Sequence, residues 1–272
     1  MSLPQFTSLS AIPLFPPSSV SLTLPARNQS WNYFIWILCI NLGVFTASAS
    51  EPTFRIERST VLTSGEGIHW SQSRPAVIPS DPLTVIVTTQ EIEKGGSHGF
   101  RDLFITETRD SGATWSEPRR IESLKRKKYP DGVEYVFGDV CPQWHEVTGK
   151  LLVTGKRFGF LLNPVPNKAK DDRSKERVAY AVYSPKTQVW TEMKIMEMPA
   201  HDHEGRPFLE PNAGCHQRVD LTNGDILLPV RYRKDPSRHV YTTIVARCRF
   251  DGETLTYQEH GSELSITPPR GL

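Results

Sequence analysis

Residues 108 to 115 read Thr-Arg-Asp-Ser-Gly-Ala-Thr-Trp, and this octapeptide carries most of the information about the fold. The Asp110 carboxylate and the Thr114 hydroxyl suit hydrogen bonds to turn amides, and Gly112 suits backbone angles that other residues avoid. Trp115 supplies a large apolar surface at the end of the segment. The segment therefore predicts a tight turn between two strands, with a structural rather than a catalytic role.

Two weaker copies of the octapeptide follow along the chain. One ends at Trp190, and the other covers residues 250–257 with an aromatic Tyr257 at its end. The interval from Trp115 to Trp190 equals the interval from Gly149 to Gly224, two glycines that each stand in a predicted turn. This equal spacing predicts a repeated unit of strands and turns. The Asn-Gly pair before Asp225 predicts positive φ angles in the second of these turns.

The rest of the sequence after residue 50 predicts an all-β protein. Runs of β-branched and aromatic residues alternate with Gly, Asn, Asp and Pro, which predicts short antiparallel strands joined by turns. The predicted strands cover residues 83–91, 102–108, 135–144, 151–160, 178–183, 218–221, 226–232 and 241–250. The charged segments 163–177 and 199–212 are interpreted as loop insertions between strands.

The composition and the charged segments indicate which classes of ligand the protein binds or does not bind. The 272 residues include 32 basic and 30 acidic side chains, and this near balance argues against a nucleic-acid-binding protein. The run Lys125 to Lys128 has two interpretations. Its four adjacent positive charges attract acidic glycans, or the run is a solvated surface loop with no specific ligand. The segment His201 to Glu204 defines no coordination geometry, so we expect no metal and no cofactor. Cys141, Cys215 and Cys248 are interpreted as structural or free thiols in buried strands.

The sequence of residues 1–49 predicts that the protein is exported. Residues 33–45 are apolar but too short to span a bilayer as a helix, and Ala47 and Ala49 form a pattern that signal peptidase accepts. We therefore expect residues 1–49 to be an N-terminal extension with a signal peptide, and residues 50–272 to be the folded domain. An uncleaved signal anchor is the alternative. The expected location is secreted, periplasmic or at the cell surface.

The segment 108–115 resembles the Asp box, or BNR repeat, of sialidase (neuraminidase) β-propellers, through Thr108, Asp110, Gly112, Thr114 and Trp115. The similarity extends over residues 70 to 260. It implies a β-propeller of the six-bladed sialidase type, of which this chain contains about three blades. The chain is thus similar to the first half of such a protein.

The resemblance also implies a set of site residues. Arg74, followed by Pro75, matches the first arginine of the family's triad, which binds the sialic-acid carboxylate; Arg55 is its rival. The family's general-acid Asp is missing from the loop 91–100, which leaves Glu93 or His98 for that role, while Glu91 matches the strand-end Glu of the family. A group of residues near strand ends either lines a central pocket or points outward: Glu210, His216, Arg231 and Arg233.

The resemblance implies an exported sialidase-like glycoside hydrolase homologue acting on terminal sialic acid or related acidic sugars, with a glycan as its partner. In the family the Tyr nucleophile and the remaining arginines lie in later blades and are not assigned in this chain, so we expect the chain to be inactive. The alternative is a noncatalytic Asp-box propeller that binds glycans or proteins at the cell surface. A third interpretation, an immunoglobulin-like sandwich, leaves the box and the equal spacing of the repeats unexplained.

Overall fold

The computed structural model describes residues 58–65, 67, 69–93, 99–161, 176–235 and 240–265. The chain divides into two units, Met1–Arg58 and Ser59–Leu272. Almost all regular structure in the described part of the second unit is β-strand, with one short 3-10 helix at Glu122–Leu124. The described residues contain no helix that is long and apolar enough to cross a membrane.

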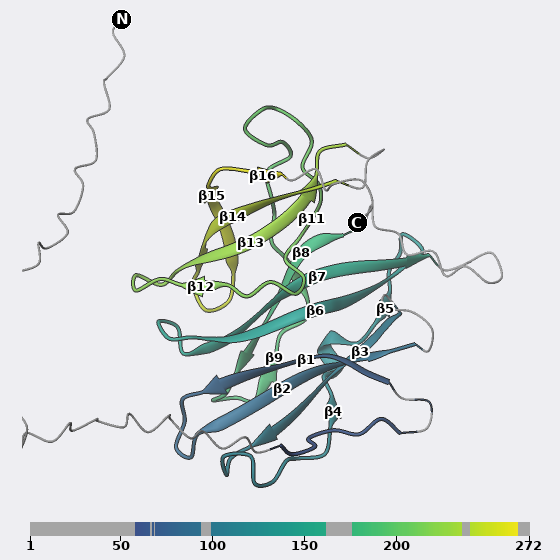
Figure 1. Cartoon of the computed structure of the whole chain (residues 1–272), viewed down its shortest axis with the longest axis vertical. Helices are drawn as coiled ribbons and strands as arrows, with labels where there is room; N and C mark the ends of the chain where they lie inside the picture. The colour runs from purple at the N-terminus through teal and green to yellow at the C-terminus, as the bar shows by residue number, and fades with distance from the viewer. Residues whose placement is uncertain are drawn as a thin grey trace, which may run out of the picture. The chain divides into compact units, whose positions relative to one another are not determined.

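The strands form three antiparallel sheets that follow one another along the chain (Figure 1). The first sheet has the order β1-β2-β3-β4, with β1 (His69–Ile78), β2 (Thr84–Ile92), β3 (Phe100–Thr108) and β4 (Arg119–Arg120). The second sheet has the order β10-β8-β7-β6-β5, and β9 also pairs with β8. Its strands are β5 (Lys127–Lys128), β6 (Val133–His145), β7 (Lys150–Leu161), β8 (Arg177–Ser184), β9 (Val189–Trp190) and β10 (Lys194–Ile195).

The third sheet has the order β11-β13-β14-β15, with β12 paired to β13 and β16 to β14. Its strands are β11 (Leu209–Asn212), β12 (Val219–Asp220), β13 (Asp225–Arg233), β14 (Tyr241–Phe250), β15 (Leu255–His260) and β16 (Leu264–Ser265). All eight predicted strands are confirmed within a few residues. The segment 199–212 is only partly a loop, because its last four residues form β11, the first strand of this sheet.

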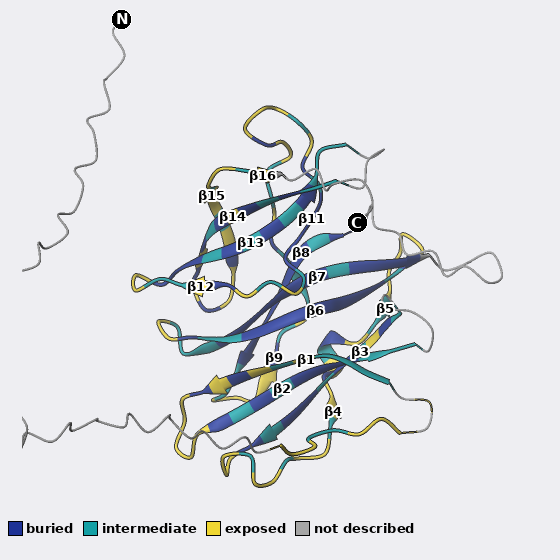
Figure 2. Cartoon of the chain, viewed as in Figure 1, coloured by how far each residue is buried: buried dark blue, intermediate teal, exposed yellow. Residues whose placement is uncertain are grey.

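Burial explains why the strands of the second sheet differ in pattern from those of the third. Strand β8 is buried at six consecutive positions, whereas β14 alternates between buried and more exposed positions (Figure 2). The second sheet has a neighbouring sheet on each face, so both faces must be apolar. One apolar cluster joins it to the first sheet, and another, which contains Met196, joins it to the third.

The predicted turn at 108–115 joins β3 to β4 and is confirmed in detail. Asp110 Oδ1 accepts hydrogen bonds from the Thr108 hydroxyl (2.7 Å) and from the Thr114 amide (2.9 Å), and Oδ2 accepts one from the Thr114 hydroxyl (2.5 Å). The Thr108 hydroxyl oxygen also accepts from the Gly112 amide at 3.0 Å. Gly112 has φ of 90° and contacts the half-buried Trp115 ring. The hydrogen bonds from Thr114 and Thr108 lower the pKa of Asp110 to about 2.

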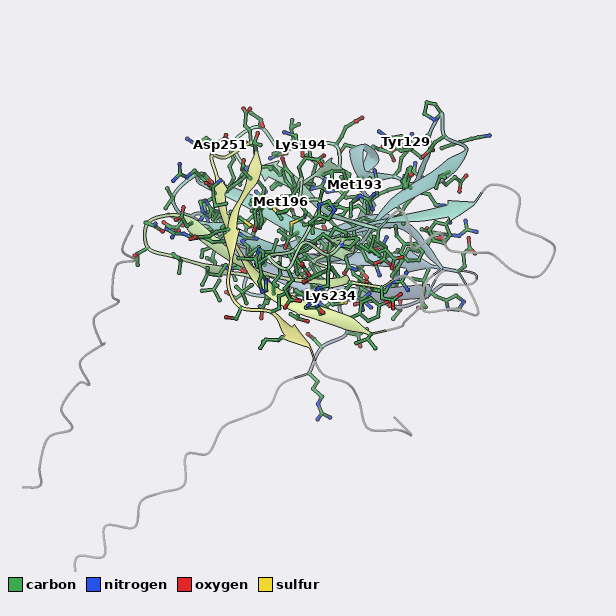
Figure 3. The ribbon with its side chains drawn as sticks, turned by 90° about the horizontal axis from the view of Figure 1, so that it is seen from above. Tyr129, Met193, Lys194, Met196, Lys234 and Asp251 are labelled. Atoms are coloured by element: carbon green, nitrogen blue, oxygen red, sulfur yellow. The ribbon has the colours of Figure 1, made fainter. Side chains whose placement is uncertain are left out.

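The two weaker copies occupy the same place in their own sheets. The segment ending at Trp190 joins β8 to β9, and the segment starting at Phe250 joins β14 to β15. In the latter, Asp251 Oδ1 accepts from the amides of Glu253 (2.8 Å) and Thr254 (2.7 Å). Lys194 of the second sheet donates to the Glu253 carbonyl at 3.0 Å, and Figure 3 shows Lys194 and Asp251 at the same edge. The three turns therefore repeat with the sheets.

The glycine turns also repeat and contact each other. Gly149 lies between β6 and β7, Gly224 lies between β12 and β13, and His145 Nε2 lies 2.9 Å from the Gly224 carbonyl oxygen. Of the Asn223-Gly224 pair only Gly224 has a positive φ, so the expectation of two positive angles is wrong. The Asn223 side chain instead accepts from the Asp225 amide at 3.0 Å, which closes the turn with Asn223 in an ordinary conformation.

Candidate functional site

One strand of each sheet, namely β1, β6 and β11, contains the same distortion. The pairing register shifts in β1 between Ser71 and Arg74, in β6 between Gly138 and Cys141, and in β11 between Leu209 and Asn212. At each shift one non-glycine residue takes a left-handed conformation; these are Gln72 (φ 55°), Asp139 (φ 53°) and Glu210 (φ 52°). Such residues cost on the order of 1–3 kcal/mol each and are concentrated at functional sites. The three bulges therefore mark the candidate site.

The first bulge holds Arg74. Its guanidinium Nη2 donates to Gln72 Oε1 at 3.1 Å, and Nη1 donates to the Ser73 carbonyl at 3.3 Å. Cys215, from the turn after β11, places its Sγ 3.6 Å from the same Gln72 oxygen. The first and third sheets therefore meet at this amide, and Arg74 is fixed beside it while half-buried.

The second bulge places Asp139 beside Cys215, which also contacts the first bulge at Gln72. The Cys215 amide donates to the Asp139 carbonyl at 2.8 Å, and Gly214 packs against both Asp139 and Lys156. Lys156 is buried and forms an ion pair with Asp139 at 2.7 Å. Lys156 Nζ also lies 5.0 Å from the centre of the Phe158 ring, in a cation–π contact. Asp139 is thus neutralised by its own lysine.

The third bulge carries two groups of polar side chains. Glu210 forms an ion pair with Arg233, and both are largely buried. Arg231 donates to Asn212 Oδ1 at 3.3 Å and lies 4.5 Å from the centre of the Tyr241 ring. Arg231 also approaches the Glu176 carboxylate at 4.0 Å, so a carboxylate of this chain already faces it.

His216 and the cysteines complete the surroundings. His216 Nδ1 lies 3.0 Å from the Pro229 carbonyl oxygen, and burial lowers the pKa of this imidazole. Burial raises the pKa of the Cys141 thiol, against the opposing effect of the Arg74 guanidinium. All three described cysteines are free thiols, and Cys215 is exposed in a turn, so the expectation that it lies in a buried strand is wrong.

The predicted acids lie at the end of β2. Glu91 and Glu93 line a polar cavity of about 310 Å³ together with Arg101, Asp102, Arg126 and Glu134. Glu93 Oε1 lies 3.3 Å from Arg101 and 3.5 Å from Arg126. Two guanidinium groups of the chain therefore already lie against the Glu93 carboxylate. His98 lies outside the described residues, and the catalytic roles of all three remain predictions.

Sequence reasoning identified Arg74 and Arg231 but missed the bulge residues Gln72 and Asp139 and the buried Lys156. A signal was present, because each of the first two bulges precedes a proline at the same spacing. Gln72 is followed by Pro75, and Asp139 is followed by Pro142. Proline cannot donate to a sheet and is tolerated at bulges, so the two prolines could have indicated the distortion.

Comparisons with known proteins give a fold and no family. No protein-family model matches the chain, and no curated protein matches it by sequence. Among solved structures, a protein of unknown function from Dyadobacter fermentans aligns over 76% of this chain and 58% of its own length, with a TM-score of 0.50 and 16% identity.

Two sialidases are also similar in structure. The Hadza microbial sialidase Hz136 aligns over 71% of this chain and 38% of its own, with a TM-score of 0.48 and 14% identity. The Trypanosoma rangeli sialidase aligns over 70% and 31%, with a TM-score of 0.49 and 16% identity. The chain thus spans about a third of the length of these sialidases. The described residues form three successive antiparallel sheets, which is the arrangement of a partial β-propeller with three blades.

Proposed function

We propose that this chain is an Asp-box protein of the sialidase kind that recognises the carboxylate of a terminal sialic acid or a related acidic sugar. Arg74 binds that carboxylate in the proposal. The observation that carries it is electrostatic: among the described residues no carboxylate lies within ion-pair distance of Arg74, although Gln72 and Ser73 hold its guanidinium in place. A guanidinium that is fixed but not neutralised is suited to a bidentate bond with a carboxylate ligand.

The neighbouring charges support this assignment over Arg231. The Asp139 carboxylate is neutralised by Lys156, so it does not repel an anion at Arg74 to the extent of a free carboxylate. Arg231 faces Glu176 and stacks on Tyr241, so part of its charge is already compensated. Arg231 is therefore assigned a secondary role in the same recognition.

A hydrolytic role needs a proton donor, for which the resemblance leaves Glu93 or His98, while Glu91 matches the strand-end Glu. Glu93 is occupied by Arg101 and Arg126, whereas Glu91 forms no ion pair with any described residue. Of the two carboxylates, Glu91 is therefore the one without an ion-pair partner among the described residues. The nucleophile of a sialidase is not assigned to any residue of this chain, so binding rather than turnover is the proposed activity of the chain as given.

The test measures binding of N-acetylneuraminic acid to the full chain by saturation-transfer NMR and titration calorimetry. Arg74→Ala is expected to weaken binding at least tenfold, and Arg74→Lys to restore it only in part because an ammonium group cannot bind bidentately. Arg249→Ala, an exposed arginine on the third sheet, is the matched control and should bind normally. Unchanged binding by Arg74→Ala, or no binding by the unaltered chain, would refute the proposal.

The proposal includes export and weak or absent hydrolysis of a fluorogenic sialoside. Export is tested by expressing the full chain with its natural N-terminus and determining the N-terminus of the product by mass spectrometry. Cleavage after Ala49 is expected. A product that retains residues 1–49 and stays with the membrane fraction would support the signal-anchor alternative instead.

A further inference from the structure

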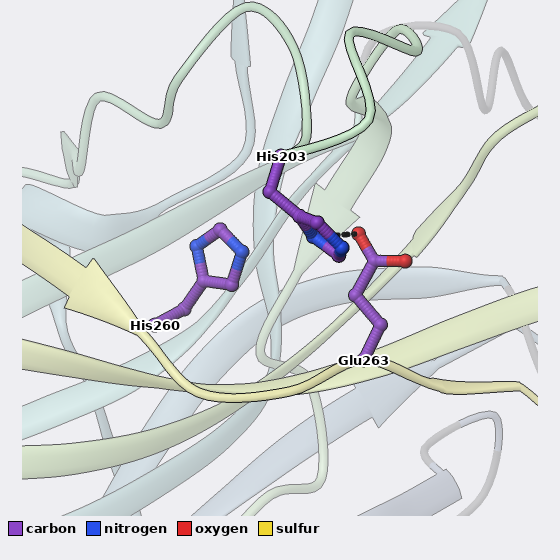
Figure 4. A group of neighbouring side chains, drawn as sticks. All are labelled: His203, His260 and Glu263. Atoms are coloured by element: carbon purple, nitrogen blue, oxygen red, sulfur yellow. Dashed lines mark ion pairs between the residues drawn. The ribbon is translucent and has the colours of Figure 1, made fainter. Parts of the chain in front are cut away.

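A second group of chemically active side chains lies on the third sheet, and the proposed sugar site does not use it. His203 lies in the turn bracketed by the bridge between His201 and Pro207, His260 ends β15, and Glu263 lies between β15 and β16. One potential ligand atom from each of His203, His260 and Glu263 lies within 4.8 Å of the others (Figure 4). These are the nitrogen and oxygen ligands found in many protein zinc sites.

A contact with Tyr257 fixes the orientation of the His260 ring. Its Nδ1 lies 2.6 Å from the Tyr257 hydroxyl, so its Nε2 remains for another partner. Figure 4 shows a ring nitrogen of His260 on the side that faces His203. When Nδ1 donates its proton to the hydroxyl oxygen, Nε2 carries the lone pair. This is the arrangement in which a second partner fixes a histidine ligand for a metal.

Glu263 is fixed even more firmly. Its side chain is largely buried; Oε2 accepts hydrogen bonds from Lys234 and from Arg206, and Oε1 accepts one from the Tyr232 hydroxyl. Burial by itself would raise the pKa of Glu263, but the hydrogen bonds from Lys234 and Tyr232 lower it. Its Oε1 also faces His203 Nδ1 at 3.4 Å.

The local charge admits a cation. Among the described residues that form these ion pairs, the carboxylates of Asp202, Glu204 and Glu263 outnumber the cations Arg206 and Lys234, so their sum is −1 when the histidines are neutral. The two cations compete with a metal for Glu263, which makes the site weaker than a closed structural zinc site. Lys234 and Arg206 contact Oε2, however, whereas Oε1 accepts only from the neutral Tyr232 hydroxyl and lies toward His203.

We propose that His203, His260 and Glu263 bind a Zn²⁺ ion, with water completing the coordination. With metal–ligand bonds of about 2.0–2.2 Å, tetrahedral ligand atoms lie about 3.4 Å apart, so atoms as far apart as 4.8 Å must approach one another by about 1.4 Å. His203 can supply this movement because its side chain is 57% exposed and lies in a turn. The ion connects the loop before β11 to the end of β15, two segments that are far apart in sequence.

The test adds Zn²⁺ to the full chain, without an affinity tag and after treatment with EDTA, and follows the melting temperature and the stoichiometry by calorimetry. One ion per chain and a rise in Tm of about 5 °C at a zinc concentration well above Kd are expected. Mg²⁺ at the same concentration should give no rise, because it prefers oxygen ligands. Co²⁺ should give a visible absorption band typical of nitrogen and oxygen ligation.

Variants decide which residues bind the ion. His203→Ala and His260→Ala should each lower zinc affinity at least tenfold, and His203→Ala should fold normally because His203 is exposed. His69→Ala and Cys215→Ser are controls that should keep the affinity, since His69 lies on β1 and Cys215 on the turn after β11. The inference is overturned if zinc gives no shift, if His203→Ala keeps the full affinity, or if Cys215→Ser removes it.

Discussion

Arg218 provides the sharpest test of how the second and third sheets are held together. This residue is 4% exposed, and its guanidinium donates to the carbonyls of Leu152 (2.7 Å) and Gln143 (2.9 Å) in the second sheet. It also forms a two-point ion pair with Asp220 of β12, at 2.7 and 3.2 Å. Burial lowers the pKa of this guanidinium, and Asp220 opposes that effect.

Replacing Arg218 by Met keeps an unbranched side chain about as long as the aliphatic part of arginine and removes every one of these bonds. Breaking a buried ion pair from one side costs about 3–5 kcal/mol. The Asp220 side chain is 18% exposed and can gain water, so the lower end applies, at about 3 kcal/mol. With a urea m-value of about 2–3 kcal/mol/M, the unfolding midpoint should fall by about 1 M.

The assay is urea unfolding of the full chain, followed by circular dichroism and tryptophan fluorescence. Arg249→Met is the control, because Arg249 is 72% exposed and its nearest carboxylate, on Asp225, lies 3.9 Å away. This control should change the midpoint by less than about 0.2 M, as expected for an exposed ion pair. A midpoint for Arg218→Met within about 0.3 M of the unaltered chain would refute the role of Arg218 as a link between sheets.

Three further predictions concern the turns and the outer faces. Hydrogen bonds lower the pKa of Asp110 to about 2, so the stabilisation by its carboxylate is present above about pH 4 and is lost as the pH falls through about 2. The difference in urea midpoint between the unaltered chain and Asp110→Asn should therefore decrease between about pH 4 and about pH 2. Gly112→Ala should lower stability by about 1 kcal/mol because alanine is strained at φ of 90°, whereas Gly261→Ala, with open space around it, should be neutral in the same melting experiment. Val77, Val219 and Val245 are at least 40% exposed on the outer sheets, so the chain should self-associate in light scattering; a monomer at all concentrations would contradict this.

The strands and turns could be predicted because their causes are local. An alternating or continuous apolar run determines a strand, and the carboxylate of Asp110 bonds to near neighbours in the chain, so the octapeptide specifies its own turn. The weaker copy of that turn at residues 250–257 was visible for the same reason, because the Asp251 carboxylate also bonds to near-neighbour amides. The short strand β11 was missed because its four residues, with Pro211 among them, carry no alternation and gain their place only by pairing with β13.

The sequence by itself determined an all-β chain of repeated antiparallel units with an Asp110-centred turn, and it indicated Arg74. Only the tertiary structure decided what surrounds Arg74, because Gln72, Asp139 and Cys215 come from three sheets and meet through long-range pairing and packing. The bulges that turn these side chains toward one another depend on the register between whole strands, and a register shift leaves no periodic trace in either strand. The meeting of His203 with His260 and Glu263 has the same origin, since two loops distant in sequence are joined by the folded sheet.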